Sequence, residues 1–149
     1  MKNFRFRLEK VLEWRRTELE MEQARLQQRT RALLELESER ANIEAAGIRS
    51  EIEVRGWQPL TGSDLTALAA FRRHVIAKEE QIEIRREEAG RKLESQKLAM
   101  IEVRRRSELL ERLKQRRLRE WQAAADRELE ELAAESYLAR VAKGPGKLD

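Results

Sequence analysis

The sequence contains no cysteine, one histidine, two prolines and six glycines in 149 residues, and aromatic residues make up 5% of it. Without cysteine the chain can form neither disulfides nor thiolate metal sites, and His74 alone is a poor ligand set for a metal. The glycines are isolated, so no glycine-rich phosphate loop indicates nucleotide binding. We therefore expect neither a cofactor nor a metal ion.

Long apolar runs are absent as well. No stretch approaches the roughly 18 to 20 apolar residues that span a bilayer. The opening sequence MKNFRFRLEK also lacks the continuous apolar core of a secretory signal. We therefore expect a cytoplasmic protein.

Charged residues, by contrast, make up 40% of the sequence. Glutamate alternates with arginine and lysine among residues that favour helices, which is typical of long, solvated helices. Carboxylate pairs such as Glu79 and Glu80 have no cleft to desolvate them and should perform no acid–base catalysis. The sequence therefore predicts an all-α protein without strands, and it does not predict an enzyme.

Apolar residues recur every seven positions, the spacing that keeps one seam of a helix facing a partner helix in a coiled coil. We expect a first helix over about residues 3–55, a loop over about 56–62 and a longer second helix over about 63–142. A short loop makes the helices antiparallel, so residues 1–149 should form a single domain, a long two-helix antiparallel coiled-coil hairpin. The two main apolar tracks are Leu12, Leu19, Leu26 and Leu33, and Leu68, Val75, Ile82, Ala89, Val103 and Leu110.

Residues around the expected loop support these boundaries. Gly56 can adopt the left-handed conformation after a helix end, which would place Trp57 over Ile52 in a Schellman-type closure. Thr61 and Asp64 resemble a capping box, with Asp in place of the usual Glu, so the second helix should start close to them.

The expected helices differ in length, which leaves part of the second one without a partner. It should end before Gly144, with a frayed tail over residues 143–149. In the register given in the next sentence, Met1 lies opposite Trp121. Residues from about 122 to 142 then have no partner helix. A segment of this kind is frayed, self-associating or a binding element. The hypothesis for the register pairs Leu12 with Leu110, Leu19 with Val103, Leu33 with Ala89 and Ile43 with Glu79, so that paired numbers sum to about 122.

Charge is distributed unevenly along the chain. Residues 2–16 contain six cations and two carboxylates, and residues 104–119 contain eight cations and two carboxylates; the register places these segments side by side. Residues 126–135 instead contain five carboxylates and one arginine. These charges are either ordinary solvated faces of a coiled coil or a basic end that binds a partner. A nucleic-acid or anionic-surface binder is the weaker alternative, because the cations are interleaved with glutamate and the aromatics are too scattered to stack bases.

Two segments resemble a known family. The opening FRFRLEKVLEWRR, residues 4–16, resembles the N-terminal signature of the flagellar export protein FliJ family, and RRRSELLERLKQRRLREW, residues 104–121, resembles the other distinctive segment of that family. The resemblance extends over essentially the whole chain, although any coiled coil would match the middle. It implies a two-helix antiparallel coiled coil similar to the γ stalk of rotary ATPases. Injectisome stalk proteins share this architecture, so a flagellar protein is indicated by the terminal motifs alone.

The resemblance further implies a stalk and escort component of the flagellar type III export apparatus, in the cytoplasm at the cytoplasmic face of the inner membrane. Its implied partners are the hexameric export ATPase FliI, whose assembly and activity it promotes from within the central cavity, the export gate protein FlhA, and substrate chaperones. Nucleic acid is not among them. A generic coiled-coil scaffold without these partners is the alternative.

Residues in the two motifs carry the implied contacts. The export-gate contact falls on Leu68, Phe71 and Val75, which match the family only in apolar character and approximate place. Phe71 lies off the seam and is available for binding, although Phe71 and Val75 would equally well thicken the seam. The ATPase contact falls on Phe4, Phe6, Arg7, Leu8, Val11, Arg15, Arg112, Leu113, Arg116 and Arg117.

Overall fold

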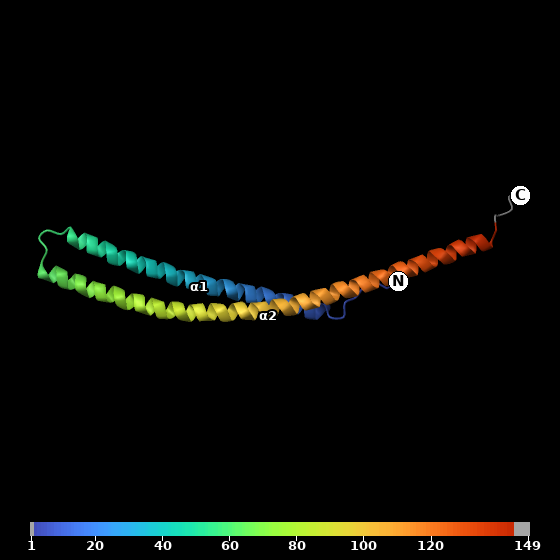
Figure 1. Cartoon of the computed structure of the whole chain (residues 1–149), viewed down its shortest axis with the longest axis horizontal. Coiled ribbons are helices and arrows are strands. Elements are labelled where there is room, and N and C mark those ends of the chain that lie inside the picture. Colours follow the sequence, from blue (N-terminus) through green and yellow to red (C-terminus); the bar gives the residue numbers. More distant parts are fainter. Residues whose placement is uncertain (1, 145–149) are drawn as a thin grey trace. The chain divides into compact units, whose positions relative to one another are not determined.

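A computed structural model describes residues 2–144 of the chain. Two helices account for most of them: α1, Glu9–Arg55, and α2, Gly62–Ala142, with 47 and 81 residues. The helices pack against each other in opposite directions, and no strand occurs within residues 2–144 (Figure 1). The predicted all-α helical hairpin with a longer second helix is confirmed.

The chain divides into two compact units, and α2 runs through both. The hairpin unit comprises residues 18–103, and the terminal unit comprises residues 1–17 together with residues 104–149. A single domain over residues 1–149 stays a prediction.

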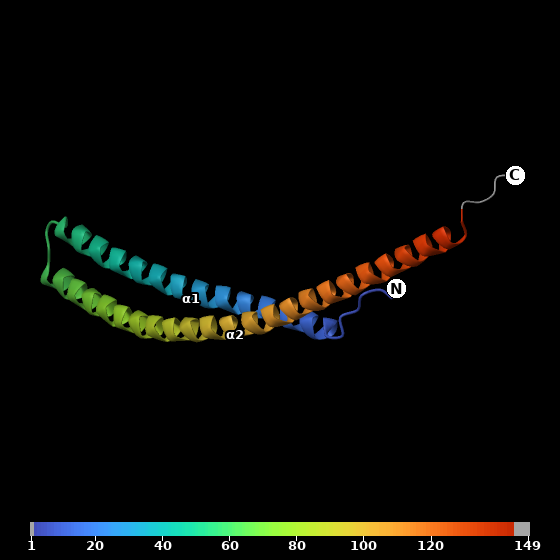
Figure 2. The ribbon, with the colours of Figure 1, turned by 45° about the vertical axis from the view of Figure 1, so that its right-hand side comes forward.

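The core of the hairpin unit is a line of apolar side chains between the helices. Leu36, Val54, Ile82, Leu93 and Val103 are buried there, and Ile82 is 1% exposed. Ile82 and Val103 lie on the predicted track of the second helix, and Val54 lies on the continuation of the first track in steps of seven. Leu36 and Leu93 follow Leu33 and Ala89 by three and four residues, at the second seam position of the heptad. Within this unit α1 and α2 run side by side in both ribbon views (Figures 1 and 2), so each helix has one face to bury.

Contacts across the seam define the register of the hairpin unit. Gly47 lies so close to Val75 that a Cβ on the glycine would meet the valine Cγ1 at 3.5 Å. Four ion pairs between exposed side chains also join the two helices. Exposed ion pairs contribute about 0 to 1 kcal/mol each to the free energy of unfolding, so they select one alignment of the helices and add little stability. Including Gly47 and Val75, the numbers of the paired residues between residues 37 and 86 sum to 122 to 124, close to the predicted 122, whereas Glu22 and Gln96, farther from the turn, sum to 118. The ion pairs are Glu51 with Arg72, Arg40 with Glu83, Glu39 with Arg85 and Glu37 with Arg86.

One step of this seam is polar. Glu22 is 9% exposed, and its carboxylate accepts hydrogen bonds from Gln96 Nε2 and, at 2.6 Å, from Arg25 Nη1. The two donors satisfy the buried carboxylate; Arg25 lies on the same helix and stays with Glu22 in any register, whereas a shifted register would remove the hydrogen bond from Gln96. Glu22 therefore favours one alignment of the helices more than it adds stability.

The turn between the helices differs in part from the expectation. The left-handed conformation expected for Gly56 is wrong, because among residues 2–144 only Gly144 has a positive φ. Instead α1 ends in a tight turn, in which the Gly56 and Trp57 N–H groups donate to the carbonyls of Glu53 and Val54 at 3.1 and 3.2 Å. These bonds satisfy carbonyls at the end of the helix, so no left-handed residue is required.

The start of α2 agrees with the prediction. Thr61 N–H donates to Asp64 Oδ2 at 2.9 Å, and Asp64 N–H donates to Thr61 Oγ1 at 3.2 Å, which is a reciprocal capping box. The helix begins at Gly62, one residue before the predicted start, and ends at Ala142 as predicted. Gly144, with φ of 70°, takes the left-handed conformation just after that end. The rest of the expected frayed tail, residues 145–149, lies outside the described residues.

The start of α1 is the main correction to the predicted fold. The helix begins at Glu9 and not near residue 3, and residues 2–6 are neither helix nor strand. Continuing the helix backwards in heptads from Leu12 would put Arg5 on the seam, opposite Arg117 in the observed register, and two arginines there would repel each other. The chain leaves the helical path before this clash arises.

Candidate partner-binding surface

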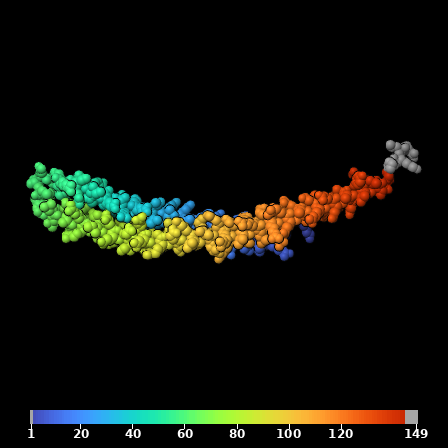
Figure 3. Space-filling view, in the orientation of Figure 1, coloured from blue at the N-terminus to red at the C-terminus, as the bar shows by residue number. Residues whose placement is uncertain are grey.

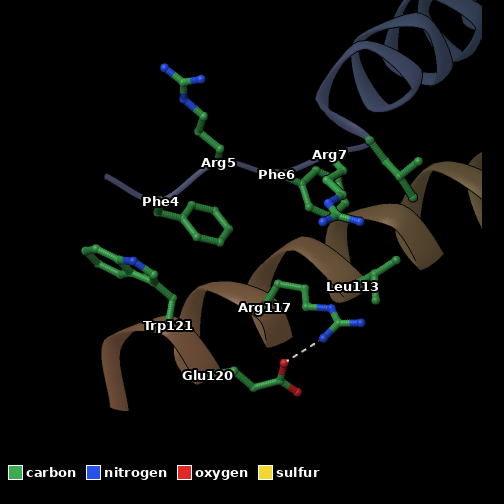
Figure 4. Close-up of a pocket in the computed structure, with 9 residues that line it drawn as sticks. Phe4, Arg5, Phe6, Arg7, Leu113, Arg117, Glu120 and Trp121 are labelled. Atoms are coloured by element: carbon green, nitrogen blue, oxygen red, sulfur yellow. Dashed lines mark hydrogen bonds and ion pairs between the residues drawn. The ribbon is translucent and has the colours of Figure 1, made fainter. Parts of the chain in front are cut away.

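The N-terminal segment, residues 2–8, lies along α2 in the terminal unit. Phe4 packs against Trp121, with ring centroids 6.0 Å apart and planes inclined by 55°. The Trp121 indole N–H also donates to the Lys2 carbonyl at 3.2 Å. Figure 4 shows the two rings facing each other between the extended segment and the helix. The tilted aromatic pair and the indole hydrogen bond hold the segment on α2.

The beginning of α1 is fixed to the same part of α2. Leu12 is fully buried against it. Lys114 Nζ donates to Glu9 Oε1 at 2.8 Å, and Arg16 Nε donates to Glu111 Oε1 at 2.6 Å. The N-terminal segment therefore leaves a helix that is already anchored on α2, which limits where the segment can lie.

The N-terminal segment and α2 together line an open hollow of about 820 Å³ next to the contact of Phe4 with Trp121. The lining combines aromatic and aliphatic side chains with guanidinium groups, so the hollow suits an apolar side chain next to a carboxylate or a carbonyl. It joins the two motif segments, which lie about a hundred residues apart in the sequence. The lining residues are Phe4, Arg5, Phe6, Arg7, Leu8, Leu113, Arg117, Glu120 and Trp121.

The arginines at this surface differ in whether they are already paired. Arg116 Nε and Arg117 Nη1 both donate to Glu120, at 3.0 and 3.1 Å, and the hydrogen bond from Arg116 is the main cause that lowers the pKa of Glu120 below its ordinary value. Within residues 2–144, neither Arg5 nor Arg7 pairs with a carboxylate. Figure 4 shows Arg5 directed away from α2. Two cations are thus free to meet a partner without breaking an internal ion pair.

The structure brings together most of the residues predicted to contact an ATPase. Val11 is 43% exposed but does not line the hollow, and neither do the exposed Arg112 and Arg116. Arg15 lies over the Trp14 ring at 4.7 Å and also stands apart from the hollow. The members that do share it are Phe4, Phe6, Arg7, Leu8, Leu113 and Arg117.

Three lining residues were not among the predicted contacts. The predicted position of Trp121 opposite Met1 was the signal that it would meet the N-terminal segment. Arg5 and Glu120 carried no comparable signal. Their place in the hollow depends on the extended path of residues 2–8, which the heptad pattern does not encode.

The predicted gate residues lie in the hairpin unit, near the turn. Leu68, Phe71 and Val75 are all half-buried. Leu68 and Phe71 line a small hollow of about 180 Å³ with Val54 and Trp57, whereas Val75 packs on the seam. Trp57 shares this hollow with Val54, whereas Ile52 does not line it and is 65% exposed, which corrects the packing expected from the Schellman-type closure.

Within the described part of the chain, no cluster of three or more histidine, cysteine, aspartate or glutamate side chains could hold a metal ion. None of the helices between residues 2 and 144 is long and apolar enough to cross a membrane.

Comparison with known proteins identifies no relative: no family model, no curated protein and no solved structure matches the chain. Membership of the FliJ family therefore stays a prediction that depends on the two terminal motifs.

Proposed function

We propose that this chain is a non-enzymatic stalk of a flagellar type III export apparatus, and that its terminal unit binds within the central cavity of the hexameric export ATPase. One observation carries the proposal. The two segments that resemble the FliJ family come together on one surface, at an aromatic hollow whose lining includes Arg5 and Arg7, which pair with no carboxylate of residues 2–144. A coiled coil that served only as a scaffold would need neither feature.

The chemistry of this surface suits a protein ring. Guanidinium groups bind carboxylates and backbone carbonyls in a fixed geometry, and an apolar hollow next to them selects a matching side chain. A single two-helix element is also asymmetric, so it presents different faces to the subunits of a ring. Differential contacts of this kind can bias the subunits towards different states and so promote assembly and turnover.

The hairpin unit supplies the second part of the proposal. Phe71, with Leu68, lines the small hollow near the turn and is accessible from solvent, so we assign the export-gate contact to these two residues. Val75 contributes mainly to the seam, because it packs on Gly47. The protein would then connect the ATPase with the export gate and with substrate chaperones at the cytoplasmic face of the inner membrane.

The ATPase contact can be tested by charge reversal. Addition of the wild-type chain should raise the hydrolysis rate of the export ATPase at amounts below one chain per subunit. The variant Arg112→Glu with Arg116→Glu and Arg117→Glu should remove this effect, because carboxylates would replace the Arg117 guanidinium that lines the hollow and two exposed guanidiniums on the same stretch of α2. Far-UV circular dichroism should show unchanged helix content, since all three side chains are exposed.

A matched control separates the proposed contact from a general effect of charge. Arg31, Arg49 and Arg73 are exposed arginines of the hairpin unit that form no ion pair with any residue between 2 and 144. Their triple change to Glu alters the net charge by the same amount and should leave stimulation intact. The proposed contact would be contradicted if both triple variants lost stimulation of the ATPase equally. It would also be contradicted if the variant changed at Arg112, Arg116 and Arg117 stimulated the ATPase fully.

A further inference from the structure

The last part of α2 has no partner helix within the described structure. Residues 126–142 are helical, and every side chain in this stretch is exposed. Leu129 and Leu132, for example, are 64% and 54% exposed. Figure 3 shows no other part of the chain covering this segment on the face in view. Tyr137, Leu138 and Val141 are exposed as well, so the segment presents much apolar surface to water.

Two leucines of this segment, together with the small residues Ala125 and Ser136, form a stripe, whereas Tyr137, Leu138 and Val141 lie away from it on the other side of the helix. Ala125, Leu129, Leu132 and Ser136 follow one another at spacings of four, three and four, which places them on one face of the helix. The same spacing defines the seam of a coiled coil. The stripe is therefore a seam without a second helix to fill it.

Carboxylates flank both sides of the stripe. Glu128 and Glu135 lie on one side and Asp126 on the other, at the helical angles that flanking charges occupy in a coiled coil. Residues 126–135 contain five carboxylates and one arginine, although the whole chain has a net charge of +4. Flanking charges select the partner of a seam, because like charges across it repel and opposite charges attract.

We propose that residues 125–139 are a docking site for a basic amphipathic helix of another protein. The apolar stripe would take the apolar face of that helix, and its lysines or arginines would face Glu128, Glu135 and Asp126. This site is separate from the hollow at Phe4 and Trp121, and it does not depend on the ATPase contact proposed above.

A second copy of the same segment paired antiparallel is a poor occupant. Two copies paired antiparallel about Leu132 would bring Glu128 of one chain next to Glu135 of the other, and the reverse pair would repel in the same way. The basic residues 104–119 of a second chain cannot pair with the stripe through their own seam. In that chain α1 already covers this seam, where Leu12 is fully buried. The charge pattern therefore favours a different, basic partner.

Synthetic helices can serve as probes for the full-length chain. One peptide, about three heptads long, carries leucine at both seam positions and lysine at the flanking positions, and a second carries glutamate in place of lysine. Fluorescence anisotropy should show that the lysine peptide binds and the glutamate peptide does not. Leu129→Asp with Leu132→Asp should weaken binding by about tenfold or more. Leu98→Asp with Ile101→Asp is the matched control, because these residues have the same spacing and are 69% and 57% exposed.

Charge exchange tests the specificity of the site. Glu128→Lys with Glu135→Lys should transfer binding from the lysine peptide to the glutamate peptide, whereas Glu80→Lys with Glu87→Lys, also exposed and seven residues apart, should not. Three results would overturn the proposal. They are no binding of the lysine peptide, equal losses in the seam variant and its control, and a concentration-dependent dimer in sedimentation that Leu129→Asp with Leu132→Asp abolishes.

Discussion

Replacement of Trp121 by alanine should release the N-terminal segment from α2 without unfolding the helices. Trp121 is half-buried, so alanine would expose about 100 Å² of apolar surface and forfeit roughly 2.5 kcal/mol. Loss of the indole hydrogen bond to Lys2 adds about 1 kcal/mol. Ordering the backbone of residues 2–8 costs about 1 to 2 kcal/mol per residue, so the docked segment has little stability to lose. Leu12 and the ion pairs of Glu9 and Arg16 are untouched, and α1 should stay on α2.

Limited trypsin digestion measures this release directly, because Arg5 and Arg7 lie in the segment and a protease needs several residues of mobile chain around its cleavage site. Cleavage there should become roughly ten- to a hundredfold faster in Trp121→Ala, which corresponds to about 1.4 to 2.8 kcal/mol. The cleavage rate of Trp121→Phe should lie between those of the wild type and Trp121→Ala, because phenylalanine keeps an aromatic ring but cannot donate the hydrogen bond to Lys2. Trp14→Ala is the control, because Trp14 is 57% exposed and does not contact the segment. Identical cleavage rates for wild type and Trp121→Ala would refute the packing argument.

Three further predictions concern stability and can all be measured by urea unfolding followed by circular dichroism. Leu12→Ala should lower the free energy of unfolding by about 2 to 5 kcal/mol, because Leu12 is fully buried, whereas Leu34→Ala at a 58% exposed position should change it little. The capping hydrogen bonds lower the pKa of Asp64, so its contribution is present above the unfolded value of about 3.9 and is lost as pH falls through the lower folded value. The free energy of unfolding of Asp64→Asn should therefore fall less than that of the wild type between about pH 5 and about pH 2. Equal decreases would contradict this. Glu22→Leu with Gln96→Leu should raise stability by about 1 kcal/mol or more, and a decrease would show that the polar step stabilises the pair.

Much of the fold follows from the sequence, because coiled-coil pairing depends on local periodicity. Burial of Ile82 and Val103 follows from heptad spacing alone, and the register follows from matching the two seams across a short loop. The reciprocal bonds of Thr61 and Asp64 follow from a spacing of three residues. Each of these features involves groups close in sequence or repeated at a fixed period.

The features that sequence reasoning missed depend on contacts between distant residues. Residues 2–8 contain good helix formers, and helix propensity alone extends α1 to about residue 3. The contact of Phe4 with Trp121 competes with that propensity, and it is not visible in a local window. The candidate surface was predicted as a set of separate motif residues. Its hollow exists only because the segment leaves the helical path.

The central claim is that the terminal unit occupies the cavity of the export ATPase as a single stalk. Native mass spectrometry of the mixed proteins tests it most directly, because it counts the chains in each assembly. We expect one copy of this chain for each ATPase hexamer, and loss of that species with Arg112→Glu, Arg116→Glu and Arg117→Glu but not with the control changes at Arg31, Arg49 and Arg73. One copy for every ATPase subunit, or no complex at all, would contradict the account.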